Sequence, residues 1–328
     1  MSPLFRRRSE EEKAADAAAS KARAEDDERS QERAAGSLAQ IEQGHIPLAA
    51  SERLAQLSQT GAARAPFSSD LAVSEWSALA RLGVTPITQV MGSSVYHVGW
   101  QPVYYNVPTE VRVLSEAYNE SRRLALGRLL EEAEACAADA VVAVRIDQGA
   151  HDWAAGAVEF IALGTAVRLP EELRHKGAGA LLSDLSGQEF ALLCNAGVRP
   201  VGIAAHTSVH YIPASPQTQQ AQSSFAGAFG GPGGSWANQE LVDFSQGVYE
   251  AREKAMYFVA EQVRALSGDG VIGVEISQHS RTHAVRRGMY ESRDLEVTFH
   301  VMGTVIREDP SLTSQAAQRP PLQIVSLR

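Results

Sequence analysis

One block of sequence occurs twice in this chain, and such a repeat restricts the fold to architectures built from two similar units. Residues 68–97 align with residues 182–211 at a constant offset of 114 positions. Identical pairs at this offset include Asp70 with Asp184, Gly83 with Gly197, and Pro86 with Pro200. We therefore treat the chain as two diverged copies of one module and predict the elements of each copy together.

The match resumes further along at larger offsets. Asp139 falls on Asp269 at an offset of 130, and Thr165 falls on Thr304 at an offset of 139. Because the offset only grows, the second copy carries two insertions, of 16 and then 9 residues. The first insertion lies within residues 213–236, which have the composition of a loop, and the second lies around residues 279–293.

Each copy begins with the signals of a short helix followed by an extended run. The Ser-Asp pairs at 69–70 and 183–184 offer N-caps for that helix. Gly83 and Gly197 suit its C-terminus, and a proline three residues later ends any continuation. We therefore expect strands over residues 87–98 and 201–212.

A long helix and two further strands complete each copy. Apolar residues recur at helical spacing from Tyr118 to Cys136, and we assign Glu120 and Arg122 to the helix surface. Val142, Val144 and Ile146 then alternate with polar or small residues, which predicts a strand with one face in water. The final strand is apolar on both faces, which favours cover by the sister copy or by another chain.

These elements predict an α+β protein made of two tandem modules. Each module has a short helix, a strand region, a long helix and two further strands, and a helical or disordered N-terminal arm precedes them. The expected boundaries are residues 1–66 for a charged arm with a short helix, 67–170 for module 1, 181–308 for module 2 with its insertions, and 309–328 for a C-terminal tail.

The N-terminal arm is rich in Ala, Glu, Lys, Arg and Asp and has no sustained apolar stripe over residues 9–43. This composition favours a solvated helix or a disordered arm. The alternative is a helix that binds a protein partner. Residues 46–57 regain helical periodicity and predict a short helix.

Charge and cysteine usage narrow the class of protein. The net charge is −9, and an acidic surface disfavours binding to nucleic acid. Cys136 and Cys194 form no CxxC motif, which fits a reducing compartment. The N-terminus has no apolar signal region, and no window approaches about 18 uninterrupted apolar residues. We therefore expect a cytoplasmic protein without a membrane span.

Two histidine pairs are the candidate ligands for a divalent metal ion. His206 and His210 lie four residues apart on a predicted strand, where about 13 Å would separate them, too far for one ion. His279 and His283 are also four apart, in the second insertion, with three arginines nearby that disfavour a cation. A structural or surface role is the competing interpretation for both pairs, and the cofactor stays unassigned.

Three motifs occur in order in the first copy. They are GSSVYH at 92–97, a long helix-to-strand run from Ser121 to Asp147, and ALGTAV at 162–167. On these motifs the chain resembles the YbjQ-like family, also described as putative heavy-metal-binding. It departs from the family pattern at Ala137 and Ala143, where glycine is usual. The resemblance implies small α+β domains that assemble into rings, often pentamers, and it brings no catalytic residues.

The leading hypothesis is a non-enzymatic protein that self-assembles and binds a metal ion or small ligand at module interfaces. It rests on the repeat, the doubly apolar strand and the absence of a catalytic motif in the sequence. One alternative is a dedicated heavy-metal-binding protein. The weaker alternative is an enzyme with a site between the two modules, which would require a concave polar pocket there.

Overall fold

The computed structural model describes residues 10–57, 67–100, 105–150, 156–174, 179–222, 238–287 and 290–312. The chain divides into two compact units, residues 1–65 and 66–328. The predicted C-terminal tail lies outside the described residues after Leu312, and so does the part of the first insertion after Gln222. No helix within the described ranges is long and apolar enough to cross a membrane.

The smaller unit is a pair of helices. α1 (Glu10–Glu42) has 33 residues, and α2 (Leu48–Leu57) follows after a short turn. The Ser37 hydroxyl accepts a hydrogen bond from the Leu48 N–H at 3.3 Å, and Arg33 forms an ion pair with Glu52. Of the two conformations expected for the arm, the structure has the helical one.

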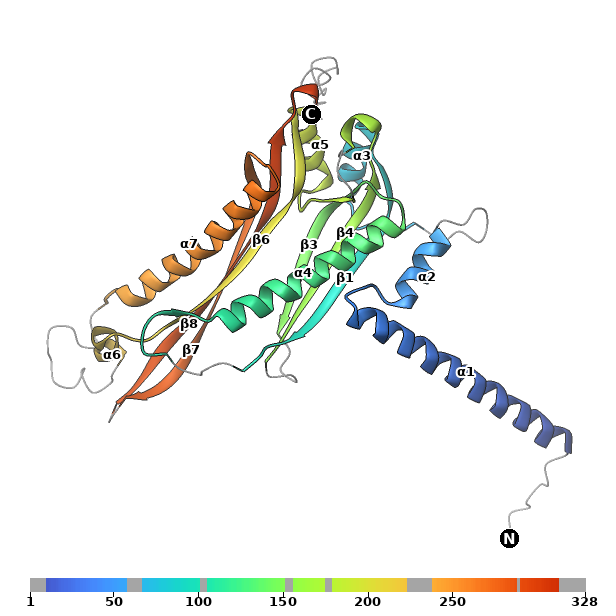
Figure 1. Ribbon diagram of the computed structural model, residues 1–328, viewed down its shortest axis with the longest axis horizontal. Coiled ribbons are helices and arrows are strands. Elements are labelled where there is room, and N and C mark those ends of the chain that lie inside the picture. The colour runs from blue at the N-terminus through green and yellow to red at the C-terminus, as the bar shows by residue number, and fades with distance from the viewer. Residues whose placement is uncertain are drawn as a thin grey trace, which may run out of the picture. The chain divides into compact units, whose positions relative to one another are not determined.

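The larger unit contains two four-stranded sheets whose long strands follow the same order (Figure 1). The first sheet runs β1 (Thr85–His97), β4 (Ala157–Arg168), β3 (Ala140–Ala150) and β5 (Leu181–Leu182). The second runs β2 (Thr109–Glu110), β6 (Val198–Ile212), β8 (Tyr290–Glu308) and β7 (Gly270–Arg287). The α+β class predicted from the sequence is confirmed.

Two long helices cover these sheets, and two short ones meet at one end (Figure 1). α4 (Arg112–Ala135) packs on β1 and β4, while α7 (Val242–Ala265) packs on β6 and β8. α3 (Val73–Arg81) contacts α5 (Gly187–Asn195). A 3-10 turn (Glu171–Leu173) follows β4, and α6 (Pro216–Gln222) follows β6. Both halves, residues 67–174 and 179–312, thus repeat the order helix, strand, long helix and two strands.

Each half also donates a short strand to the sheet of the other. β5, from the start of the second half, pairs in parallel with β3 of the first. β2, from the first half, pairs antiparallel with β6 of the second. Val167 at the end of β4 is fully buried in a cluster that includes Leu185 and Phe190 of the second half. The two halves therefore share a hydrophobic core cluster at this end of the sheets.

The predicted N-caps of the short helices are wrong. α3 begins at Val73, where the Glu75 carboxylate accepts from the Ala72 N–H at 2.6 Å, and Ser186 caps α5. Ser69 and Ser183 instead hydrogen-bond Thr165 and Thr304, at 3.0 and 3.1 Å. The two serines anchor the chain to the last strand of their own half, a tertiary contact that local capping rules do not include.

The alternating strand after α4 also differs from expectation. Val141, Val142, Ala143 and Val144 are all buried, because the pairing of β3 with β4 shifts register between Val142 and Arg145. Ala143 has a φ of 54°, and β7 has the same shift at Gly273, whose φ is 63°. Such a bulge re-aims the backbone of the strand. One face of β3 is consequently covered by the second half instead of water.

Candidate ligand site between the two sheets

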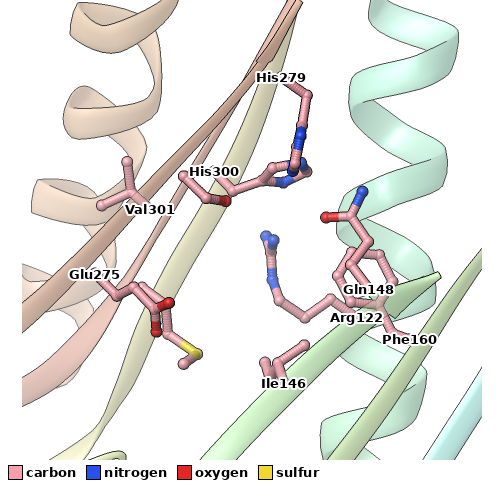
Figure 2. A pocket seen from close by; sticks show the side chains of 10 residues that line it. Arg122, Ile146, Gln148, Phe160, Glu275, His279, His300 and Val301 are labelled. Carbon is pink, nitrogen blue, oxygen red and sulfur yellow. The ribbon is translucent and has the colours of Figure 1, made fainter. Parts of the chain in front are cut away.

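A cavity of about 220 Å³ lies between the two halves (Figure 2). Its walls come from α4, β3 and β4 on one side and from β7 and β8 on the other. The lining residues that matter for its chemistry are Arg122, Phe160, Glu275, Ser277, His279 and His300. Both halves are required to form it.

Arg122 is the charged group of this cavity. The residue is 6% exposed, and its guanidinium donates to the Thr207 hydroxyl at 2.6 Å and to the Asn119 side-chain oxygen. Both acceptors are neutral, and within the described residues no carboxylate forms an ion pair with Arg122. Burial lowers its pKa to about 10, so the group stays cationic at neutral pH.

His300 lies beside Arg122 and shares a partner with it. Its Nδ1 is 2.8 Å from the Thr207 hydroxyl, which already accepts from Arg122. We assign the hydroxyl proton to the bond with Nδ1, which leaves the Nε2 of His300 as an N–H donor. That Nε2 is buried and has no hydrogen-bond partner in the described structure. Burial, with Arg122 and His279 nearby, lowers the pKa of His300 to about 3.

Aromatic side chains hold these two groups in place. The Tyr118 ring packs edge-on against Phe160 and against His300, with centroid distances of 6.2 and 5.3 Å. The guanidinium carbon of Arg122 lies 5.9 Å from the centre of the Phe160 ring. A guanidinium over an aromatic face is attracted by its π electrons. Arg122 is therefore fixed on one side, with its charged end facing the cavity (Figure 2).

The mouth of the cavity is polar and the remaining walls are apolar. Glu275, His279 and Gln148 are exposed residues at the mouth, and Ser277 is half-buried between them and His300. Ile146, Val301 and Met302 complete the walls. This combination of one buried cation, one free N–H donor and apolar walls suits a small ligand that carries an acceptor at one end.

The predicted histidine candidates separate in the structure. His206 stacks on Phe258 of α7 with ring centres 4.3 Å apart, and His210 is buried further along β6. His283 is 3.2 Å from the Glu296 carboxylate, whereas the ring of His279 is 5.8 Å from that of His300. The structure therefore joins His279 to His300 and not to His283. Among the described residues no group of three or more His, Cys, Asp and Glu side chains could hold a metal ion.

Arg122 was assigned to the surface from the sequence, and that assignment is wrong. Its neighbour Arg123 does lie at the surface and pairs with Glu120 at 2.6 Å, whereas Arg122 falls four residues after Tyr118 and three before Ala125, on the apolar side of the helix. A second signal was present in the repeat. The set Arg122, Ile146, Gln148 and Phe160 recurs as Arg252, Ile276, Gln278 and Phe299 at the established offsets. Of Arg122 and its counterpart Arg252, only Arg122 has the other half of the chain packed over it.

The fold is of the α+β class, with one cavity lined by both halves of the larger unit, and comparison with known proteins gives its family. The family model described as putative heavy-metal-binding matches residues 75–170. The chain belongs to this YbjQ-like family. No solved structure matches the chain significantly.

The relatives fall into a long and a short class. The chain is 33% identical over 265 residues to the Encapsulin nanocompartment protein Rv1762c of Mycobacterium tuberculosis, covering 80% of this chain and 91% of that protein. It is 40% identical over 58 residues to a UPF0145 protein of Clostridium perfringens and 42% over 60 residues to one of Clostridium novyi. Those matches cover 18% of this chain and about half the length of the relatives, 53% and 56%.

Proposed function

We propose that this protein is a non-enzymatic cytoplasmic protein whose tandem modules assemble head to tail with further copies of the chain, and that its junction cavities hold a small ligand. The observation that carries the proposal is the junction between α3 and α5. Each surface used in that junction has a counterpart in the other half of the chain, and each counterpart presents an exposed apolar residue, Trp76 on α3 and Leu192 on α5.

Within the chain, the junction is closely packed. The Gly187 N–H donates to the Glu75 carboxylate at 3.2 Å, and a Cβ on Gly187 would lie 3.0 Å from the Leu79 side chain. Leu79 is fully buried, and Phe190 on the facing surface of α5 is 1% exposed. The face of α3 that contains Leu79 thus meets the face of α5 that contains Phe190, and these two faces are not equivalent positions of the repeat.

The counterparts of these two faces are open. At the offset of 114, Ala78 of α3 corresponds to Leu192 of α5, which is 59% exposed, whereas Leu193, the counterpart of Leu79, is half-buried. Trp76 of α3 corresponds to Phe190 and is 41% exposed. The open face of α5 around Leu192 in one chain could therefore pack against the open face of α3 around Trp76 in the next chain. This contact would repeat between chains the α3–α5 packing that exists within each chain.

The strand edges support the same direction of assembly. The Ala143 and Val144 N–H groups donate to the Leu185 and Ser183 carbonyls of the second half, at 2.9 and 3.0 Å. The matching residues of β7, Gly273 and Val274, lie on an edge strand of the described sheet. A strand edge left open in this way is a template for pairing with another chain.

A contact between unlike faces is heterologous, so it propagates until a ring closes or a filament forms. The name of the long relative, an encapsulin nanocompartment protein, supports a role in a self-assembled structure. The chain itself supplies both sides of the contact, so no second protein is required for assembly.

Light scattering coupled to size-exclusion chromatography tests this proposal. The wild-type chain should elute as an oligomer at micromolar concentration. Trp76→Asp damages only the open face of α3 and Leu192→Glu only the open face of α5, so each variant alone should be a monomer. A charge placed in an apolar contact makes association unfavourable by several kcal/mol.

Mixing the two variants is the sharper part of the experiment. Each retains one intact face, so the mixture should form dimers that grow no further. Tyr257→Asp, which changes an exposed residue of α7 outside both faces, is the matched control and should leave the oligomer intact. A monomeric wild-type chain, or single variants that still form the full oligomer, would refute head-to-tail assembly.

The cavity satisfies the geometric requirement of the enzyme alternative, a concave polar pocket between the modules. Its chemistry favours binding over catalysis. A general base works best when its pKa lies near the operating pH, and the pKa of His300 is held at about 3 by burial. No hydrogen bond joins Ser277 to His300 in the described structure, so a nucleophile–base pair is not assembled there.

Dedicated heavy-metal binding is the second candidate function. It is supported by the family description and by the approach of the His279 and His300 rings. Calorimetric titration with zinc, copper and nickel tests it. Saturable heat in the wild-type chain that disappears in the His279→Ala variant would establish a metal site in the cavity lined by His279 and His300. The absence of heat with all three metals would exclude such a site.

A further inference from the structure

The cavity between the two sheets contains a charge that the described protein does not balance. Removing a guanidinium from water costs several kcal/mol unless a counter-charge compensates it. Arg122 is 6% exposed, and within the described residues its guanidinium donates hydrogen bonds only to the neutral oxygens of Thr207 and Asn119. An arginine has five N–H donors, so these two acceptors leave part of its hydrogen-bonding capacity unused.

A second donor lies next to it. His300 is more than nine-tenths buried, and its Nε2 has no hydrogen-bond partner in the described structure. An unsatisfied buried donor costs about 1–3 kcal/mol unless it is paired. A single acceptor group in the cavity could satisfy both the histidine and the arginine.

We propose that this cavity binds a small organic monocarboxylate, whose carboxylate is held by Arg122 and His300. This inference rests on the ligand site of the proposed function and not on the assembly. Arginine prefers a carboxylate because its planar fork matches two oxygens at once. The charge of Arg122 repels a metal cation at the same position, so the carboxylate and a metal ion held by His279 and His300 are competing occupants that the titrations distinguish.

The walls select among anions. Phe160, Ile146 and Met302 offer apolar surface beside the charged groups, which suits a short hydrocarbon part and not a phosphate. Glu275 at the mouth repels a second negative charge on the ligand. A volume of about 220 Å³ is several times the ~30 Å³ of one water and smaller than drug-sized sites. Butyrate has the matching charge and size.

Isothermal titration of the full chain with sodium butyrate at pH 7.5 tests the proposal, against sodium chloride at equal ionic strength. Wild-type protein should show saturable heat with one site per chain. Arg122→Gln should weaken binding at least about tenfold, because one charge-assisted pair is worth more than about 1.4 kcal/mol. Arg123→Gln is the matched control, since it removes the neighbouring exposed arginine, and should bind as wild type does.

A second variant protects the test against misfolding. Ser277→Phe fills the cavity and leaves both Arg122 and His300 in place, so it should also abolish the heat. Inorganic phosphate and the neutral amide butyramide are the competing probes, and neither should bind. Equal binding of butyramide, binding of phosphate in place of butyrate, or unchanged affinity in Ser277→Phe would each overturn the proposal.

Light scattering on the same samples separates this inference from the assembly. If butyrate binds to a wild-type chain that is monomeric, the carboxylate site stands and head-to-tail assembly fails. If the chain is oligomeric and no probe except a neutral or metal ligand gives heat, the assembly stands and the carboxylate site fails.

Discussion

Trp76 of α3 and Phe190 of α5 lie at corresponding positions of the two sequence copies, but Trp76 is 41% exposed whereas Phe190 is 1% exposed. The difference is one of surroundings. Phe190 packs into a cluster with Leu79 and Val167 of the first half. Trp76 instead contacts Phe67, with ring centres 5.1 Å apart. The same aromatic position is thus core in one copy and surface in the other.

This contrast predicts unequal costs for two alanine substitutions. Phe190→Ala should lower the free energy of unfolding by about 3–5 kcal/mol, because it leaves a cavity in a packed core. Trp76→Ala should cost no more than about 1 kcal/mol in the monomer. Urea unfolding at low protein concentration measures both without a contribution from association. Similar losses in the two variants would contradict the assignment of Phe190 alone to the core.

Gly92 of β1 is predicted to be intolerant of a side chain. A Cβ at this position would lie 2.0 Å from the Ala125 carbonyl oxygen and 2.5 Å from the Leu129 nitrogen, both backbone atoms of α4. Gly92→Ala must therefore displace the helix and should cost about 3 kcal/mol or more. Thermal unfolding measures the loss.

The corresponding residue of the second half is the control for that experiment. At the offset of 114 it is His206, whose ring fits against Phe258 because α7 leaves room for it. His206→Ala removes a stacking contact and should cost at most about 1.5 kcal/mol. A larger loss for His206→Ala than for Gly92→Ala would contradict the closer approach of α4 to Gly92 than of α7 to His206.

Ala137 should be improved by glycine. It follows α4 with a φ of 54°, a left-handed conformation that costs an L-residue roughly 1–2 kcal/mol. Ala137 is exposed, so loss of its methyl group removes no packing. Ala137→Gly should raise the free energy of unfolding by about 0.5–1 kcal/mol. Ala135→Gly, at the end of the helix itself, should lower it by up to about 1 kcal/mol, and a gain there would refute the reasoning.

The buried histidines predict a pH dependence of stability. Burial lowers the pKa of His210, and it lowers that of His300 to about 3. Between pH 7 and 5.5 these histidines become protonated in the unfolded chain but stay neutral in the folded protein. The free energy of unfolding therefore falls as pH falls. Each histidine contributes a slope of up to about 1.4 kcal/mol per pH unit in that range.

Denaturant unfolding of His300→Gln at pH 7 and at pH 5.5 checks the contribution of that residue. The variant cannot take up a proton in either state, so its loss of stability between the two pH values should be smaller than that of the wild type. An exposed histidine gives the control: His97→Gln should keep the wild-type slope. Parallel slopes in all three proteins would mean that His300 titrates normally.

Much of the fold followed from local signals. Gly83 and Gly197 have φ values of 76° and 80°, as expected for residues that end α3 and α5. α4 and α7 both have 24 residues, and they begin 130 positions apart, at the offset derived from the repeat. Asp139 and Asp269 each accept a backbone N–H at 2.8 Å, from Leu169 and Glu308. These features depend on residue types close in sequence or on the end of the adjacent strand. The helices and strands could therefore be predicted from this one sequence.

The candidate site could not be predicted in the same way. Arg122 lies four residues after Tyr118 and three before Ala125, so helical spacing places it on the apolar side of the helix, but a charged side chain in that position is commonly assigned to the edge of the stripe. The approach of His300 to Arg122 through Thr207 depends on how α4 crosses β6 and β8. The cavity exists only because residues from both halves surround it.

The sequence by itself determined the α+β class, the order of helix, strand, long helix and two strands in each half, and the glycines that end α3 and α5. Those properties are local, since they depend on side-chain size, backbone freedom and periodicity. Only the tertiary structure decided which of two equivalent faces is covered, why Trp76 is open where Phe190 is closed, and that Arg122 is buried without a counter-charge. Burial is a property of the packed neighbours of a residue, and two copies of the same sequence pattern acquire different neighbours when they pack against each other.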